Sequence, residues 1–171
     1  AVADKKNIIK SKENAFELQM DVTPGELATT GVELYNAKGE KVKIYFDTKE
    51  RKLVMDRTES GLVEFGKRAV PHDIEKNYSD VHQGVGNTPF RVFNSINYKN
   101  DFALGTWAPL SLCKGTTYHV DIFVDKCSVE IFVDGGRIAM TNLVFPTAPY
   151  TSVKFYNNGA STSFRNITLS E

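Results

Sequence analysis

The feature that most constrains the fold of this 171-residue chain is the alternation of apolar and polar residues with a period of two. Apolar residues occupy every second position in residues 16–22, and the same alternation returns in residues 42–47 and in residues 118–133. Side chains of a β-strand point alternately to the two sides of a sheet, so this period is typical of half-buried strands. No long window shows the apolar spacing of an amphipathic helix. The sequence therefore predicts an all-β fold.

Turn-forming residues separate the expected strands at short intervals. Residues 36–39 lie between a strand expected at 31–35 and one at 42–47, and residues 48–51 lie before a strand expected at 52–57. Gly, Asn and Asp at such positions favour tight turns. Short strands joined in this way, without helices, are typical of two antiparallel sheets packed face to face. We therefore expect a two-sheet antiparallel β-sandwich of the concanavalin or jelly-roll type.

Length and charge limit the other possibilities. The length suffices for one core, so we expect residues 1–171 to be a single domain. Within it, we expect residues 66–99 to form long loops around short edge strands that fold back over the sandwich. The 21 Lys and Arg residues balance 21 Asp and Glu residues, which argues against a nucleic-acid or membrane partner. No apolar run approaches the roughly 18 residues of a membrane span. The N-terminus lacks an initiator Met and a signal peptide, which indicates a mature chain or a trimmed fragment.

Residues 118–143 predict a three-stranded meander. We place two-residue turns at Asp125-Lys126 and Gly135-Gly136. Counting outward sets Asp121 against Glu130 across the first turn and Glu130 against Thr141 across the second. One face of the meander is then apolar and comprises Val120, Ile122, Val124, Cys127, Val129, Ile131, Val133, Ile138 and Met140. The other face carries His119, Asp121, Ser128, Glu130, Phe132 and Thr141.

The same register separates the two cysteines. Cys127 is expected in the core beside a turn, whereas Cys113 lies beyond the far end of the strand, on the order of 40 Å away at ~3.3 Å per residue. We therefore predict two free thiols. Neither the cysteines nor the histidines have the spacing of metal ligands, so we predict no metal site and no cofactor. The histidines are His72, His82 and His119.

Two carboxylates face each other in this register, and they need a cation or a ligand between them, because like charges repel across a sheet. Arg57, at the end of an expected strand, is the candidate partner of Asp121 and Glu130. Such a network either holds strands in place or binds a polyol through charge-assisted hydrogen bonds, with an aromatic ring on the apolar face of the sugar. Two carboxylates also suit a glycosidase, but an open sheet face does not exclude water. We therefore predict no catalytic residue.

Three ordered blocks of the sequence resemble a known family. They are residues 55–61 (MDRTESG), residues 120–137 (VDIFVDKCSVEIFVDGGR), and Thr141 followed by Phe145-Pro146. Together they look like the C-terminal β-sandwich module of glycoside hydrolase family 32, the family of invertases, levanases and inulinases. That module is related to the fructan-binding carbohydrate-binding module family 66. The likeness runs over residues 16–169 and is weak between residues 66 and 100.

The resemblance implies a non-catalytic accessory module that follows a catalytic propeller in a larger fructan-degrading enzyme. The family's catalytic motifs, Asn-Asp-Pro-Asn-Gly, Arg-Asp-Pro and Glu-Cys, are absent from this chain. The implied ligand is a terminal β-fructofuranosyl unit of levan, inulin, sucrose or a fructo-oligosaccharide. The alternative is a purely structural or oligomerisation module that buttresses the propeller. The implied location of the enzyme is secreted, periplasmic or at the cell surface.

The resemblance also implies site residues. Asp56 and Arg57 match the family's Asp-Arg-Thr block, and Glu130 matches its Val-Glu-Ile-Phe block. Further candidates for sugar binding are Asp121, Phe132 and Tyr45. The Ser-Ser pair that is common in the family is Cys127-Ser128 in this chain.

Overall fold

The chain folds almost entirely into β-strands. The computed structural model describes residues 7–63, 102–111, 115–159 and 161–171, and these residues contain no α-helix. They form eleven strands, which are β1 (Ile8–Lys10), β2 (Phe16–Thr23), β3 (Thr29–Tyr35), β4 (Lys41–Asp47), β5 (Lys52–Asp56), β6 (Gly105–Pro109), β7 (Tyr118–Val124), β8 (Ser128–Val133), β9 (Ile138–Leu143), β10 (Ser152–Asn158) and β11 (Ser163–Ser170). The loops expected at residues 66–99 lie outside the described residues.

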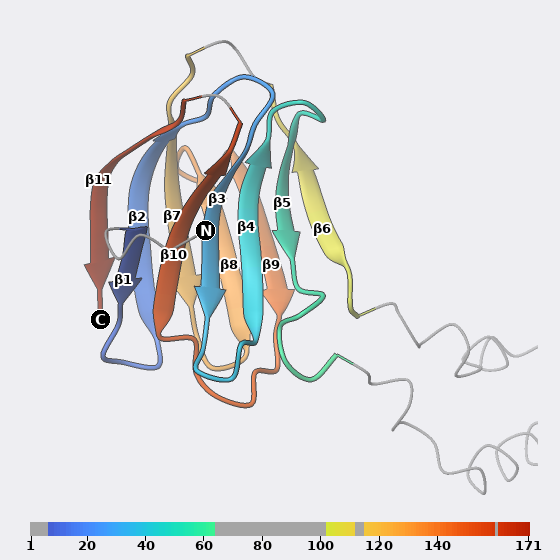
Figure 1. Ribbon diagram of the computed structural model, residues 1–171, viewed down its shortest axis with the longest axis vertical. Helices are drawn as coiled ribbons and strands as arrows, with labels where there is room; N and C mark the ends of the chain where they lie inside the picture. Colours follow the sequence, from blue (N-terminus) through green and yellow to red (C-terminus); the bar gives the residue numbers. More distant parts are fainter. Residues whose placement is uncertain (1–6, 64–101, 112–114, 160) are drawn as a thin grey trace, which may run out of the picture.

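The strands form two antiparallel sheets that lie one behind the other (Figure 1). The six-stranded sheet has the order β1-β10-β3-β4-β5-β6, and the five-stranded sheet has the order β11-β2-β7-β8-β9. Strands that are distant in sequence therefore become neighbours, as β2 and β7 do. The predicted two-sheet β-sandwich is confirmed.

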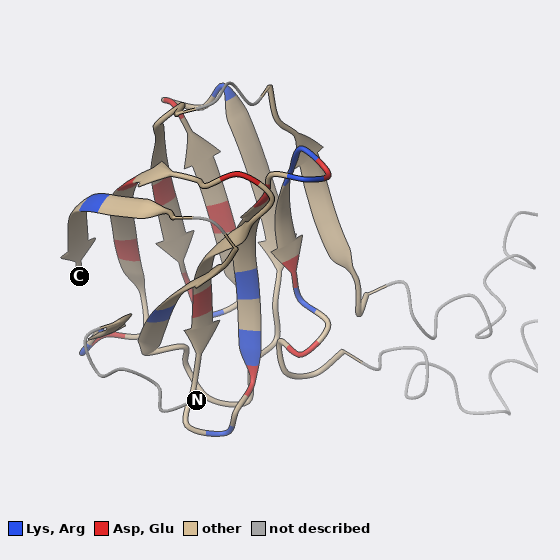
Figure 2. Cartoon of the chain, turned by 45° about the horizontal axis from the view of Figure 1, so that its top comes forward, with Lys and Arg blue, Asp and Glu red and all other residues tan. Residues whose placement is uncertain are grey.

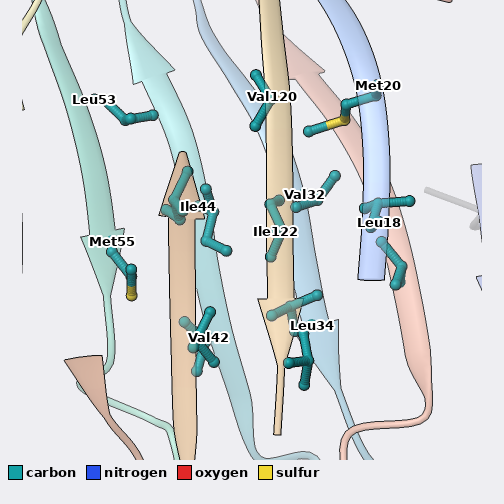
Figure 3. Close-up of a cluster of buried hydrophobic side chains, with 14 of the residues drawn as sticks. Leu18, Met20, Val32, Leu34, Val42, Ile44, Leu53, Met55, Val120 and Ile122 are labelled. Carbon is teal, nitrogen blue, oxygen red and sulfur yellow. The ribbon is translucent and has the colours of Figure 1, made fainter. Parts of the chain in front are cut away.

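The core lies between the inner faces of the two sheets (Figure 3). Leu18, Met20 and Ile122 of the five-stranded sheet face Val32 and Ile44 of the six-stranded sheet, and each is at most 2% exposed. Burying a side chain of this size contributes about 1.5–3 kcal/mol. The alternation in the sequence thus becomes an alternation between core and outer face along each central strand.

The predicted turns before and after β4 are confirmed, and a side-chain oxygen organises each of them. Asn36 Oδ1 accepts hydrogen bonds from the N–H groups of Lys38 and Glu40 at 3.0 and 3.1 Å. Gly39 supplies the positive φ of 80° that this turn requires. After β4, Asp47 Oδ1 accepts hydrogen bonds from two backbone N–H groups at 3.1 and 2.9 Å. Such Asx interactions let the chain reverse within a few residues.

The first hairpin of the meander turns one residue later than predicted. The N–H of Asp125 donates to the carbonyl of Ser128 at 2.9 Å, so Lys126 and Cys127 are the central turn residues. Moving a turn by one residue moves the cross-strand register by two, which preserves the faces of the strands but changes every pair. Phe132 therefore lies opposite Asp121, and Phe123 lies opposite Glu130.

The predicted pairing of Asp121 with Glu130 is therefore wrong. The placement of Cys127 in the core is also wrong, because this free cysteine lies exposed in the turn. Cys113 lies outside the described residues. The second hairpin is confirmed, with Glu130 opposite Thr141. The remaining residues of the predicted apolar face are buried or partly buried, and they are Val120, Ile122, Val124, Val129, Ile131, Val133, Ile138 and Met140.

The stability of the sandwich should depend on the contact between the sheets. We expect Ile122→Ala to lower the free energy of unfolding by about 2–5 kcal/mol, because it opens a cavity at a side chain that is fully buried. Ile167→Ala is the matched control, since that side chain is 39% exposed, and it should change the free energy of unfolding by less than about 0.5 kcal/mol. Urea unfolding curves measure both. Equal losses in the two variants would contradict this account of the core.

Candidate functional site

The six candidate residues lie in three places on the sandwich. The outer face of the five-stranded sheet carries Asp121, Glu130 and Phe132. Tyr45 and Asp56 lie on the outer face of the six-stranded sheet, on the opposite side of the core. Arg57 directly follows β5. The structure therefore does not bring the six residues together into one site.

Arg57 joins the edges of the two sheets. Its Nη1 donates to the carbonyl of Leu143, at the end of β9, at 3.0 Å. Its guanidinium carbon lies 4.0 Å from the centroid of the Phe102 ring. A second polar link close by runs between the same edges, because Asn142 Nδ2 donates to Thr106 Oγ1 at 2.7 Å. Among the described residues, no ion pair connects Arg57 to Asp121 or Glu130, its predicted partners. The contacts of Arg57 that the structure describes instead link the two sheets.

A hollow opens on the outer face of the five-stranded sheet. In the cross-strand register Glu17 lies opposite Phe123, and Phe123 lies opposite Glu130, so an exposed ring stands between two carboxylates. The hollow has a volume of about 450 Å³. It is lined by Ala15, Phe16, Glu17, Phe123, Val124, Asp125, Ser128, Glu130, Ser170 and Glu171.

Both central carboxylates of the hollow keep much of their hydrogen-bonding capacity. Glu17 accepts a hydrogen bond from Gln19 Nε2 at 3.0 Å, and Glu130 accepts a long one of 3.4 Å from Thr141 Oγ1. Within the described part of the chain, neither carboxylate forms an ion pair. A carboxylate accepts several hydrogen bonds, so both can still receive them from a ligand.

Phe123 gives the hollow an apolar wall, and Phe132 packs against Phe123 from beside the hollow. Phe123 is 39% exposed, and its ring meets that of Phe132 edge to face with the centroids 5.8 Å apart. Sequence reasoning named Phe132 but missed Phe123 and Glu17. The alternation in residues 16–22 already placed Glu17 on a polar face, but no local signal indicates that β2 lies beside β7.

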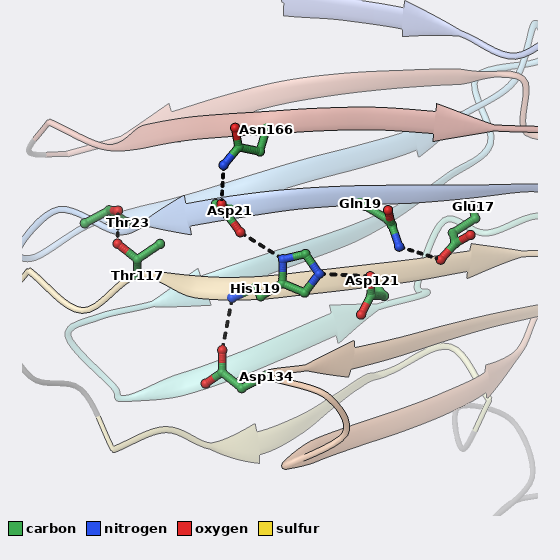
Figure 4. Close-up of polar contacts among 9 residues, drawn as sticks. All are labelled: Glu17, Gln19, Asp21, Thr23, Thr117, His119, Asp121, Asp134 and Asn166. Carbon is green, nitrogen blue, oxygen red and sulfur yellow. Dashed lines mark hydrogen bonds and ion pairs between the residues drawn. The ribbon is translucent and has the colours of Figure 1, made fainter.

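His119 organises the adjoining polar cluster on the same sheet face (Figure 4). Its Nδ1 lies 2.8 Å from Asp21 Oδ1, which is a hydrogen bond between β7 and β2. Its Nε2 lies 3.4 Å from Asp121 Oδ1, where the alignment is too poor for a hydrogen bond and the contact is electrostatic. Asn166 Nδ2 donates to the second oxygen of Asp21 at 2.6 Å. Asp121 is therefore paired with His119 and not with Glu130 or Arg57.

This cluster shifts two pKa values in opposite directions. The hydrogen bond to Asp21, and then the charges of Asp121, Asp21 and Asp134, raise the pKa of His119 against a smaller opposing effect of burial. The hydrogen bonds from His119 and Asn166 lower the pKa of Asp21. The charged forms of the two partners thus stabilise each other.

The outer face of the six-stranded sheet places Tyr45 and Asp56 among charges of both signs. Lys43 lies opposite both Glu33 and Asp56 in the register, and Lys154 lies opposite Glu33 (Figure 2). Burial raises the pKa of Tyr45, and the charge of Asp56 raises it further. The phenol therefore stays protonated at neutral pH and can donate a hydrogen bond.

The described ranges contain neither a metal-binding cluster nor a membrane-spanning helix. No group of three or more His, Cys, Asp or Glu residues there could hold a metal ion. No helix that is long and apolar enough to cross a membrane is present among the described residues.

Comparison with known proteins assigns the family. Residues 1–171 match the family model described as "Glycosyl hydrolases family 32 C terminal". The chain therefore belongs to the C-terminal domain family of the family 32 glycosyl hydrolases, and the resemblance seen in the sequence is confirmed.

Individual relatives agree with this assignment. The chain is 30% identical over 95 residues to a levanbiose-producing levanase of Bacillus subtilis (strain 168), covering 56% of this chain and 17% of that protein. It is 23% identical over 158 residues to a levanase of the same strain, covering 91% of this chain and 18% of the levanase. This chain thus spans less than a fifth of the length of either relative. Among solved structures, an exo-inulinase from Aspergillus awamori shares the fold, with a TM-score of 0.62 and 18% identity over 96% of this chain and 25% of that chain.

Arg57 should contribute to stability through its link between the sheets. We expect Arg57→Ala to lower the free energy of unfolding by about 1–2 kcal/mol, because a hydrogen bond to a charged group and a cation–π contact are lost. Arg137→Ala is the control, since that side chain is 61% exposed and its ion pair among the described residues is a local one with Asp134. A loss below about 0.5 kcal/mol is expected. Urea unfolding measures both. An Arg57→Ala variant that is as stable as the wild type would contradict the link.

The His119 cluster should make stability depend on pH. Because folding raises the pKa of His119, its contribution is fully present below pH 6.5 and is lost as the pH rises through the raised value. Because folding lowers the pKa of Asp21, its contribution is present above pH 3.8 and is lost as the pH falls through the lowered value. The stability difference between the wild type and His119→Gln should therefore be largest between pH 3.8 and 6.5 and should shrink in alkaline solution.

An NMR titration of the His119 imidazole tests the cause directly. Its pKa should lie above 6.5 in the wild type and should fall in Asp21→Asn, which removes the carboxylate that faces Nδ1. An unchanged His119 pKa in that variant would mean that Asp21 does not stabilise the charged form of the imidazole.

Proposed function

We propose that this chain is a non-catalytic accessory module of a larger fructan-degrading glycoside hydrolase, and that its hollow binds a terminal β-fructofuranosyl unit. The observation that carries the proposal is the placement of the exposed Phe123 ring between the carboxylates of Glu17 and Glu130. The family supports the class of enzyme, and the levanases among the relatives suggest a fructan as the ligand. The volume of about 450 Å³ lies in the range of small-molecule sites.

The chemistry of the hollow suits a neutral polyol. Carboxylates accept charge-assisted hydrogen bonds from hydroxyl groups, and adjacent hydroxyls of one sugar can use Glu17 and Glu130 together. The C–H face of a sugar ring packs on an aromatic ring such as Phe123. An uncharged ligand requires no excess of positive or negative charge on the protein, and the chain has 21 basic and 21 acidic residues.

A catalytic role for the hollow has little support. Its carboxylates lie on the outer face of a sheet, where water is not excluded. The motifs that carry the family's catalytic residues are absent from the sequence. We therefore propose that hydrolysis belongs to an N-terminal propeller of the same polypeptide, and that the enzyme acts outside the cytoplasm, as the family resemblance implies.

A purely structural role is the second candidate, and one observation favours it. Three leucines whose side chains are 40%, 37% and 54% exposed have their backbone close to the Arg57 link, at the β6 and β9 edges. They are Leu62, Leu104 and Leu143. Exposed apolar side chains at one end of a domain favour docking against another domain or a second copy. Size-exclusion chromatography with light scattering tests this role, because an uncovered docking patch should promote self-association of the 171-residue chain.

Calorimetry with levan, inulin and sucrose tests the fructosyl site. We expect binding to be weakened about tenfold or more in Glu130→Gln, because a charge-assisted hydrogen bond of about 1.5–3 kcal/mol is lost. Glu33→Gln is the matched control, since Glu33 lies on the other sheet beside Lys154, and it should leave the affinity unchanged. If none of the three sugars produces heat, the binding role fails and the structural role stands.

A further inference from the structure

A row of five residues, three of which carry aromatic rings, crosses the outer face of the six-stranded sheet. The cross-strand register aligns Tyr156, Gly31, Tyr45, Val54 and Trp107, one residue from each of five neighbouring strands. Trp107 ends the row on the edge strand β6 and is 57% exposed. The sequence alone did not reveal this row, because its residues become neighbours only through the order of the strands in the sheet.

Two glycines shape this face in different ways. Gly31 lies between the two tyrosines, and a Cβ there would overlap the carbonyl oxygen of Ile44, so no larger residue fits. Gly105 lies two residues before Trp107 and opposite Asp56. A Cβ at Gly105 would be 3.5 Å from a methyl carbon of Val54, which is an ordinary van der Waals contact, so a glycine here adds no side chain between Val54 and Asp56. We call Trp107, Gly105, Val54, Asp56 and Tyr45 the Trp107 platform.

Hydrogen-bonding groups surround the exposed ring. Asp56 Oδ1 accepts a hydrogen bond from the N–H of Thr58 at 2.9 Å, which orients the carboxylate and leaves capacity on both oxygens. Burial, and then the charges of Asp56 and Asp47, raise the pKa of Tyr45. Burial, and then Tyr45, Glu33 and Asp56, raise the pKa of Tyr156, so both phenols remain donors. Lys52 Nζ lies over one face of the Trp107 ring, 4.4 Å from its centroid, so a ligand would stack on the other face. Acceptors and donors therefore flank an exposed aromatic surface.

The charge pattern of this face narrows the class of ligand. Lysines and carboxylates alternate along the neighbouring row, which runs through Lys154, Glu33, Lys43 and Asp56 (Figure 2). A nucleic acid requires a surplus of positive charge, which this face lacks. The core of a protein interface is depleted in charged residues, whereas charges surround the single exposed ring here. A neutral polysaccharide has apolar C–H faces for the ring and hydroxyls for both kinds of polar group.

We propose that the Trp107 platform is a second carbohydrate-binding surface, which stacks a sugar unit of a fructan chain on Trp107 while Asp56 and Tyr45 hydrogen-bond its hydroxyls. The choice of a fructan rests on the proposed function. The platform is an open sheet face, so it accepts units within a chain, and the hollow on the opposite sheet takes a chain end. One module then holds two chains or two segments of one branched polymer, which raises its apparent affinity for a polymer over that for a single sugar.

Tryptophan fluorescence tests the platform separately from the hollow. Trp107 is the single tryptophan of the chain, so its emission reports on this face alone. We expect levan and inulin to change the emission with saturation, both in the wild type and in Glu130→Gln, whose hollow is impaired. In calorimetry, Trp107→Ala in the Glu130→Gln background should weaken the remaining binding about fivefold or more, because the stacking contact is lost.

Two controls keep the result specific. Asp56→Asn keeps the shape of the platform and should also weaken binding to the Glu130→Gln variant. Tyr35→Ala removes a ring of the same face that lies outside the aligned row, and it should have no effect. Circular dichroism checks that each variant is folded.

The outcomes separate this proposal from the fructosyl site. Unchanged Trp107 emission at levan concentrations that saturate the calorimetric signal would overturn the platform and leave the hollow standing. A saturable emission change, with calorimetric binding insensitive to Glu130→Gln, would overturn the hollow and support the platform. If the wild type self-associates and Trp107→Ala is monomeric without any response to levan, the face is a contact between copies and the proposal is wrong.

Discussion

The burial of two apolar sheet faces against each other is the interaction on which the rest of the structure depends. Every second residue of the central strands is used for this contact, and side chains such as Leu18, Ile44 and Ile122 are almost completely shielded from water. The residues between them must then point outward, on one side of the sandwich or on the other. The core therefore sorts the polar residues into two sets that lie on opposite outer faces.

This sorting explains why the candidate residues do not form one site. A guanidinium and two carboxylates look like a single polyol site when they are read from the sequence. In the structure Glu130 belongs to one outer face, Asp56 belongs to the other, and Arg57 lies between them at the sheet edges. Each face has its own exposed aromatic side chain, Phe123 on the five-stranded sheet and Trp107 on the six-stranded sheet. The two sugar-binding surfaces that we propose therefore lie on opposite sides of the core.

In the meander of β7, β8 and β9, the local sequence predicts the faces of the strands but not every cross-strand pair. Alternation identified the inward and outward residues of β7, β8 and β9, because the period of a strand is a property of the chain itself. The Gly135-Gly136 turn was also placed correctly, since glycine tolerates the positive φ values of 68° and 92° found there. The turn at Lys126-Cys127 carries no glycine, so its position was misjudged by one residue. That error left the faces intact and gave Asp121 and Glu130 the wrong partners.

The sequence by itself determined the all-β class, most of the strands and turns, the membership of the family and the polar character of residues such as Glu130. These properties follow from local periodicity, from turn chemistry and from short blocks of sequence. Only the tertiary structure decided which residues become neighbours: Glu17 and Phe123, Asp21 and His119, and Gly105 and Asp56. Such neighbours come from strands far apart in the chain, and their pairing is set by strand order and register, which the packing of the common core selects.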